Sequence, residues 1–239
     1  SEAVIHGPAR GSEHLVTKYS TDGTKVRGTV NNCGTGKTPW GTYASGEENW
    51  YGYFTRDAND NTKRGSKDKN VAALNRYGRS AGAASRHGWE SAGNSDHYTR
   101  WNNSAIGVSA KEDFRNEMNN FGYIVELDPY KPTQALRKRT ALGRMGHENV
   151  TFAKAIPGQA IVGYMGDDAR GEYIYKFVSS ALWVASDAHV EDKLAVGDKY
   201  LDKGTLYVAK FKDDGSGEWI ELSMKNPVVA SYPYFEFKS

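Results

Sequence analysis

From residue 121 onward the sequence repeats one pattern: a short run of β-branched and aromatic residues, then a turn rich in Gly and Asp. Such runs cover residues 121–127, 160–165, 172–178, 204–211 and 218–222. Short strands separated by turns are typical of antiparallel sheets, and the last two runs, joined by residues 212–217, predict a hairpin. We therefore expect a mainly β fold of antiparallel strands, arranged as a sandwich, a barrel or propeller blades.

The first half of the chain is less regular. Residues 1–30 predict short extended pieces with a turn at 21–24, and the glycines of residues 31–50 indicate a loop. Residues 56–120 are polar, without a clear period, and too long for a plain loop. We interpret them as a partly helical surface insertion, with a short helix near 71–77. Residues 223–239 form an apolar, aromatic tail that contains Tyr232, Tyr234, Phe235 and Phe237.

The composition of the chain argues against several classes of protein. The 239 residues include 15 Tyr, 8 Phe and 6 Trp, which argues against intrinsic disorder. The net charge is +2 and no long basic block occurs, so nucleic-acid binding is not indicated. No apolar run approaches the roughly 20 residues that a membrane-spanning helix needs. The single Cys excludes an intrachain disulfide.

Residues 31–43, NNCGTGKTPWGTY, superficially suggest a nucleotide-binding P-loop. That motif needs Gly where Asn31 stands, and Pro39 would break the helix that follows it, so we reject this interpretation. Cys33 is either a soft metal ligand or nucleophile, or a small buried apolar residue. The adjacent Glu47 and Glu48 are either a site for a hard cation or a solvated loop end.

Two further segments contain paired ligand-type residues. His147 and Glu148 on a strand would point to opposite faces, so we expect at most one of them to face a given site. Asp167 and Asp168 follow an apolar strand and fit either oxygen ligation of Ca²⁺ or an ordinary Asx turn. No Gly-x-Ser-x-Gly motif is present to provide a serine nucleophile on a strand-to-helix turn.

Taken together and in order, these segments resemble the PhoX family of bacterial alkaline phosphatases. The resemblance lies in five strings: NNCGTGKTPWGTYASGEEN, FGYIVELDPY, KRTALGRMGHENV, YMGDDARGEYIYKFVS and GTLYVAKFKDDGSGEW. It implies a β-propeller with added helices and strands, and dependence on iron (Fe³⁺) and Ca²⁺. It also implies hydrolysis of phosphomonoesters without a phosphorylated Ser, a monomer, and twin-arginine export to the periplasm or the medium.

The resemblance assigns roles to particular residues. It makes Cys33, Glu48, Glu148 and Asp167 metal ligands, and it places Asn32 where it can help to bind phosphate. The chain departs from the family pattern at Gly46, where a Cys is common.

Other parts of the family pattern are missing from this sequence. The Arg-Pro-Glu-Asp motif, which supplies a phosphate-binding Arg and a metal-binding Glu, is absent, as is an export signal. We therefore expect residues 1–239 to be one incomplete domain. Two alternatives stay open: a non-catalytic binding or assembly module with the family fold, and a metal-dependent phosphodiesterase.

Overall fold

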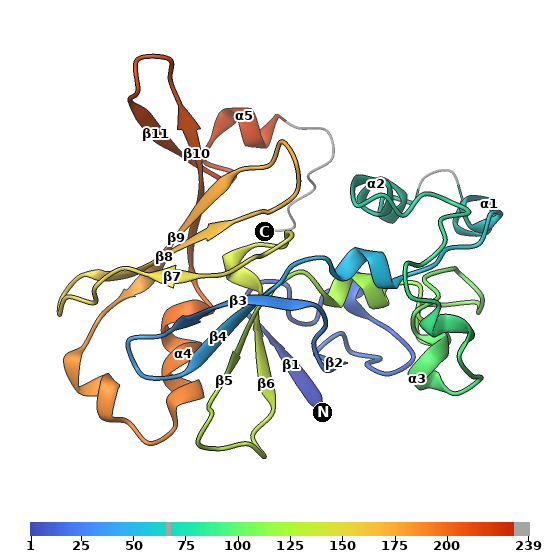
Figure 1. Cartoon of the computed structure of the whole chain (residues 1–239), viewed down its shortest axis with the longest axis horizontal. Coiled ribbons are helices and arrows are strands. Elements are labelled where there is room, and N and C mark those ends of the chain that lie inside the picture. The colour runs from blue at the N-terminus through green and yellow to red at the C-terminus, as the bar shows by residue number, and fades with distance from the viewer. Residues whose placement is uncertain (66–67, 232–239) are drawn as a thin grey trace.

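The computed structural model describes residues 1–65 and 68–231, with two β-sheets on one side and the helices α1 to α3 on the other (Figure 1). The first sheet has the strand order β2-β1-β6-β5-β4-β3. All its neighbouring pairs are antiparallel except β1 and β6, which are parallel. Its strands are β1 (Glu2–His6), β2 (Lys25–Arg27), β3 (Asn32–Lys37), β4 (Tyr43–Glu47), β5 (Ile124–Leu127) and β6 (Leu136–Arg139).

The second sheet has the order β11-β10-β9-β8-β7 and is antiparallel throughout. Its strands follow one another along the chain as a meander. They are β7 (Thr151–Phe152), β8 (Ala160–Gly166), β9 (Ile174–Leu182), β10 (Gly204–Phe211) and β11 (Gly217–Glu221).

The α-helices are short: α1 (Asp60–Arg64), α2 (Asn70–Arg76), α3 (Asp96–Thr99), α4 (Lys193–Leu201) and α5 (Pro227–Ala230). Single 3-10 turns occur between the elements, among them η2 (Trp50–Tyr53) and η4 (Glu117–Asn120). In the described part of the chain, no helix has the length and apolar character needed to cross a bilayer.

One hydrophobic core joins the two sheets and α4. Ala44 and Ile124 come from the first sheet, Phe177 from the second and Tyr200 from α4, and all four are fully buried. Trp40 fills the space between them and stacks on Tyr200 with ring centroids 5.6 Å apart. Burial of these large side chains holds the sheets and α4 together.

A second core joins the first sheet to the segment from 50 to 121. Ile5 of β1 packs with Trp50, Leu74, Trp101 and other apolar residues of that segment. Replacing a fully buried Trp such as Trp50 with Ala costs about 3–5 kcal/mol. Glu48 lies in the chain between Ala44 of the first core and Trp50 of the second, so packing fixes the backbone on both sides of it.

The mainly β prediction is confirmed, and so is the partly helical segment near 56–120. The predicted strands correspond to β5, β8, β9, β10 and β11, and the predicted short helix corresponds to α2. The prediction that residues 31–50 form a loop is wrong, because β3 and β4 pair there as a hairpin. Tyr232, Tyr234, Phe235 and Phe237 lie outside the described residues.

The glycines that indicated a loop have another role. A Cβ on Gly36 would lie 2.0 Å from the carbonyl oxygen of Val150, and one on Gly46 would lie 2.3 Å from that of His147. These positions therefore allow the backbone of residues 147–150 to lie directly against the hairpin.

Candidate metal centre

Glu47 and Glu48 have opposite environments at the end of β4. The Glu47 side chain is buried, forms an ion pair with Lys138 at 2.8 Å, and accepts hydrogen bonds from the backbone N–H groups of Gly122 and Tyr123. Glu48 is only partly buried and faces Cys33, whose thiol donates a hydrogen bond to its carboxylate. Glu47 is thus a structural residue, and Glu48 is available as a ligand.

Cys33 reaches this position through an irregularity in β3. The pairing of β3 with β4 changes register between Asn32 and Thr35, and such a bulge re-aims the side chains on it. Asn31, just before it, has a φ of 51°, a left-handed conformation that Asn tolerates. Its carbonyl accepts from the N–H of Glu48 at 3.1 Å, and its Oδ1 accepts from that of Asn49 at 2.9 Å. Cys33 is exposed, which removes the interpretation of it as a buried apolar residue.

His147 and Glu148 point in opposite directions, as their alternation along an extended segment predicts. His147 is fully buried, and its Nε2 donates to the carbonyl oxygen of Gly143 at 3.1 Å. Burial lowers the pKa of His147 to about 4, so the ring is neutral at pH 7. Glu148 is exposed on the side of Cys33, and its N–H donates to the carbonyl of Gly166 at 3.3 Å.

The turn after β8 completes the arrangement. Asp167 accepts a hydrogen bond from the N–H of Ala169 at 3.1 Å, which is the Asx turn that the sequence left open. It also forms an isolated antiparallel bridge with His147. Asp168, to which the PhoX resemblance assigns no role, is the residue whose carboxyl group makes a hydrogen bond with Glu48. Its N–H donates to the carbonyl of Gly146 at 3.1 Å.

The carboxyl groups perturb one another. Burial, together with the hydrogen bond to Asp168, raises the pKa of Glu48, while the hydrogen bond from Cys33 opposes this. The hydrogen bond to Glu48 is also the main cause that raises the pKa of the Cys33 thiol. Two carboxyl groups in contact need either a shared proton or a cation between them. The donor set of one thiol and several carboxyl groups therefore fits a mixed iron and calcium site.

The four predicted ligands do not form a closed set of ligand atoms. Within the described residues, the one group of three His, Cys, Asp or Glu side chains with all ligand atoms within 4.8 Å of one another is His6, Asp198 and Asp202. The guanidinium of Arg139 already contacts Asp198 at 2.6 Å and Asp202 at 2.8 Å. That group is a neutralised ion-pair network, not a second metal site.

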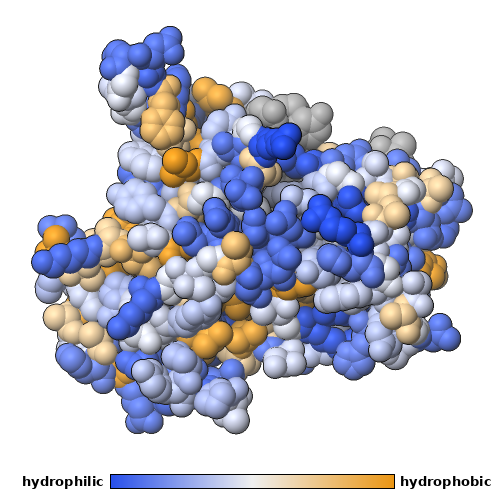
Figure 2. Space-filling view, in the orientation of Figure 1, coloured by the Kyte–Doolittle hydropathy of each residue, from blue (hydrophilic) through white to orange (hydrophobic). Residues whose placement is uncertain are grey.

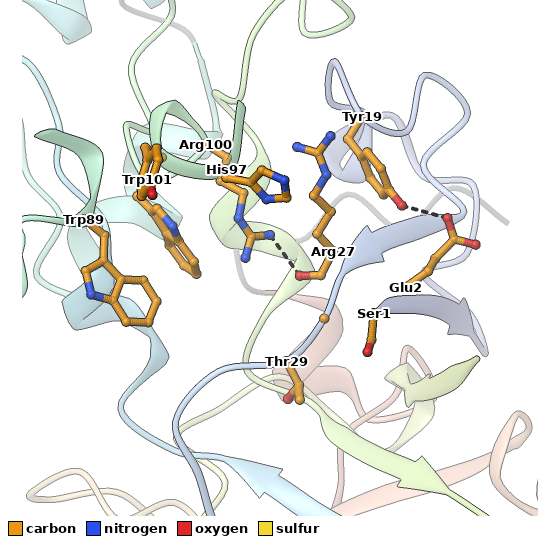
Figure 3. Close-up of a pocket in the computed structure, with 11 residues that line it drawn as sticks. Ser1, Glu2, Tyr19, Arg27, Thr29, Trp89, His97, Arg100 and Trp101 are labelled. Carbon is orange, nitrogen blue, oxygen red and sulfur yellow. Dashed lines mark hydrogen bonds between the residues drawn. The ribbon is translucent and has the colours of Figure 1, made fainter. Parts of the chain in front are cut away.

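Asn32 is exposed beside Cys33, and its Oδ1 accepts from the hydroxyl of Thr29 at 2.8 Å. Because an anion binds to donors, the amide nitrogen is the group that Asn32 can present to it. Thr29 also lines a pocket of about 630 Å³ between β2 and α3, shown in Figure 3. The walls of this pocket include Arg27, Trp89, Arg100 and Trp101. None of the predicted metal ligands lines it, so it is distinct from the candidate centre.

Comparisons with known proteins identify the family of this chain. The family model for alkaline phosphatase PhoX matches residues 1–234. The chain belongs to the PhoX family. Among solved structures it is similar to Pseudomonas fluorescens PhoX in complex with vanadate, a transition state analogue, with 39% identity and a TM-score of 0.74 over 93% of this chain. No curated protein matches it.

PhoX membership agrees with the propeller-like architecture expected from the sequence. The match covers only 35% of the P. fluorescens chain. The present chain thus spans about a third of that PhoX protein, and it holds the segments that carry Cys33, Glu48, Glu148 and Asp167.

Proposed function

We propose that this PhoX chain contributes to a metal-dependent phosphatase that hydrolyses phosphomonoesters. The observation that carries the proposal is the position of Glu48, whose carboxyl group contacts both the thiol of Cys33 and the carboxyl group of Asp168. Without a cation, this cluster of acids repels a phosphate dianion. With cations bound, the same cluster becomes a site that attracts phosphate.

We assign the ligand roles to Cys33, Glu48, Glu148 and Asp167, with Fe³⁺ and Ca²⁺ as the cations. Thiolate suits iron, and carboxylate oxygens suit Ca²⁺ and Fe³⁺. When bound, such cations neutralise the phosphate charge and polarise the ester bond. Cys33 would bind such a cation as a thiolate and so release its proton, and Asn32 would donate its amide N–H to a phosphate oxygen.

No phosphorylated serine is needed in this scheme, because the cations meet the charge of the transition state. The phosphate-binding Arg that the PhoX resemblance implies has no counterpart in this sequence. We therefore propose that these 239 residues hold one part of the site and that the chain alone has weak activity or none. Full turnover of p-nitrophenyl phosphate by the chain alone would overturn this part of the proposal.

The test compares Cys33→Ala and Glu148→Ala with Glu218→Ala, which changes an exposed carboxylate on β11. In the complete enzyme that includes these residues, the first two variants lose bound iron and calcium together with phosphatase activity, whereas the third keeps both. Metal content and activity retained in Cys33→Ala would overturn the assignment. A substrate panel that favours diesters over monoesters would select the phosphodiesterase alternative, and a lack of iron and calcium at integral stoichiometry would select the non-catalytic module.

PhoX membership also supports proposals about the cellular setting. We propose a monomer that is exported to the periplasm or secreted. Fractionation of cells and light scattering of the purified protein test these two statements independently of the site.

A further inference from the structure

The end of α2 contacts all three segments that carry the proposed carboxylate ligands. The ring of Tyr77 lies against Trp50, with centroids 4.6 Å apart, and its hydroxyl donates to the carbonyl oxygen of Arg144 at 3.0 Å. Arg76 forms an ion pair with Glu172. In the sequence, Trp50 comes two residues after Glu48, Arg144 four before Glu148, and Glu172 five after Asp167.

The contacts at Tyr77 form one packed unit. The guanidinium of Arg144 lies over the rings of both Trp50 and Tyr77, at 4.3 and 4.9 Å from their centroids. The indole N–H of Trp50 donates to the carbonyl of Met145 at 3.0 Å. The segment after Glu48 and the segment before Glu148 are therefore bound to each other, and Tyr77 covers their junction.

The contact at Arg76 reaches the third segment. Glu172 is nearly buried, with 13% of its side chain exposed, whereas Arg76 is about half exposed at 53%. An ion pair with one exposed partner contributes little to global stability. Its geometric effect is larger, because it joins the Asp167–Asp168 turn to a helix that is already packed against the other two segments. In Figure 1, α2 faces the turn between β8 and β9.

We propose that Arg76 and Tyr77 are positioning residues, which hold the Glu48, Glu148 and Asp167 segments at the spacing that a bound cation requires. This inference rests on the proposed function, since the cation is the one proposed above. Carboxylates that converge on one point repel one another until the cation arrives. A rigid support holds the carboxylates close together against this repulsion in the metal-free protein. The cation then binds to ligands that are already in place, and its affinity is higher.

The role of residues 56–120 follows from this. The sequence of this segment is polar and typical of an insertion, yet α2 lies within it, and the last residue of α2 and the residue after it are the two positioning residues. In Figure 2 the surface across the middle of this face is largely hydrophilic, between the sheets and the helical segment, as a surface for a charged ligand requires.

The experiment measures Ca²⁺ binding by titration calorimetry with CaCl₂ alone, in the wild-type protein and four variants. Arg76→Ala removes the ion pair, Arg76→Lys keeps the charge, and Tyr77→Phe removes one hydroxyl while keeping the ring. Asn75→Ala, at an exposed neighbouring position on α2, is the matched control. Outer partners of metal ligands typically change affinity by about 10–100-fold. We expect a loss of about tenfold for Arg76→Ala and Tyr77→Phe, partial recovery in Arg76→Lys, and no change in Asn75→Ala.

A second readout separates positioning from folding. The melting temperature of the metal-free protein should be the same in Tyr77→Phe and Asn75→Ala. Unchanged Ca²⁺ affinity in Arg76→Ala and Tyr77→Phe overturns the inference and leaves the proposed function intact. A loss of affinity that follows a loss of folded protein also overturns it. Absence of Ca²⁺ binding in the wild-type protein overturns both.

Discussion

Glu47 and Glu48 are adjacent in the chain, yet Glu47 forms a buried ion pair with Lys138 and Glu48 accepts a hydrogen bond from the exposed Cys33. The first carboxylate stabilises the fold and the second is free to bind a cation. The same division separates His147, which is buried, from Glu148, which is exposed. In both pairs the alternation of an extended backbone buries one residue and leaves accessible the other, which we propose as a metal ligand.

Substitution of Glu47 and substitution of Glu48 should have different effects on the protein. Glu47→Ala leaves the buried ammonium of Lys138 unpaired and should lower the free energy of unfolding by about 3–5 kcal/mol. Glu48→Ala should leave stability of the metal-free protein nearly unchanged and remove bound metal. Urea denaturation and metal analysis on both variants make the comparison. Equal stability of the two variants would contradict the division of roles.

The glycines of the β3–β4 hairpin give a second prediction. Gly36→Ala should destabilise the protein by about 1–3 kcal/mol or more, because the added methyl group would meet the carbonyl of Val150. It should also weaken metal binding, since Glu148 lies in the displaced segment. Gly166→Ala is the control for stability: its added Cβ would have no atom within 4 Å and its φ is not positive. A melting temperature that is lower for Gly166→Ala than for Gly36→Ala would contradict this.

A third prediction concerns pH and the segment that carries α1. Burial by itself raises the pKa of Asp60, but hydrogen bonds from Ala105, Arg64 and Arg56 outweigh it, so the net pKa lies below 3.8. A carboxyl group with a lowered folded pKa contributes stability above its unfolded pKa and loses it as pH falls through the folded value. Asp60→Asn should therefore be destabilising at pH 7.

That destabilisation should shrink as the pH falls below about 3.8, where Asp60 itself takes up a proton. Urea denaturation of Asp60→Asn and wild type at a series of pH values measures the difference. A difference in stability that is constant down to the acid limit would rule out the ionised carboxylate as its cause.

The sequence predicts the second sheet well because its strands pair with their neighbours along the chain. The turns between β8 and β9 and between β10 and β11 carry ordinary turn residues, so local pattern is enough. The local pattern does not predict β3 and β4. Their glycines allow the backbone of residues 147–150, more than 100 positions away, to lie directly against the hairpin. A contact of that kind has no local signal.

Local sequence pattern is also insufficient to predict the whole candidate site. The order of the motifs singled out Cys33, Glu48 and Glu148, which lie close together. Asp168 was a candidate from its sequence alone, but the family motif assigns the role of ligand to its neighbour Asp167. The roles of Arg76 and Tyr77 depend on how α2 packs against three distant segments, and neither residue stands in a motif. Exposure of Cys33 follows from the irregularity in β3, which the sequence string does not reveal.

The most direct test of the account is the iron and calcium content of the purified complete enzyme that includes these residues, measured by elemental mass spectrometry for wild type, Cys33→Ala and Glu47→Gln. We predict whole-number equivalents of metal in wild type, none or a small fraction in Cys33→Ala, and the wild-type content in the folded fraction of Glu47→Gln. Wild-type metal content in Cys33→Ala would contradict the claim that these loops form part of a PhoX metal centre.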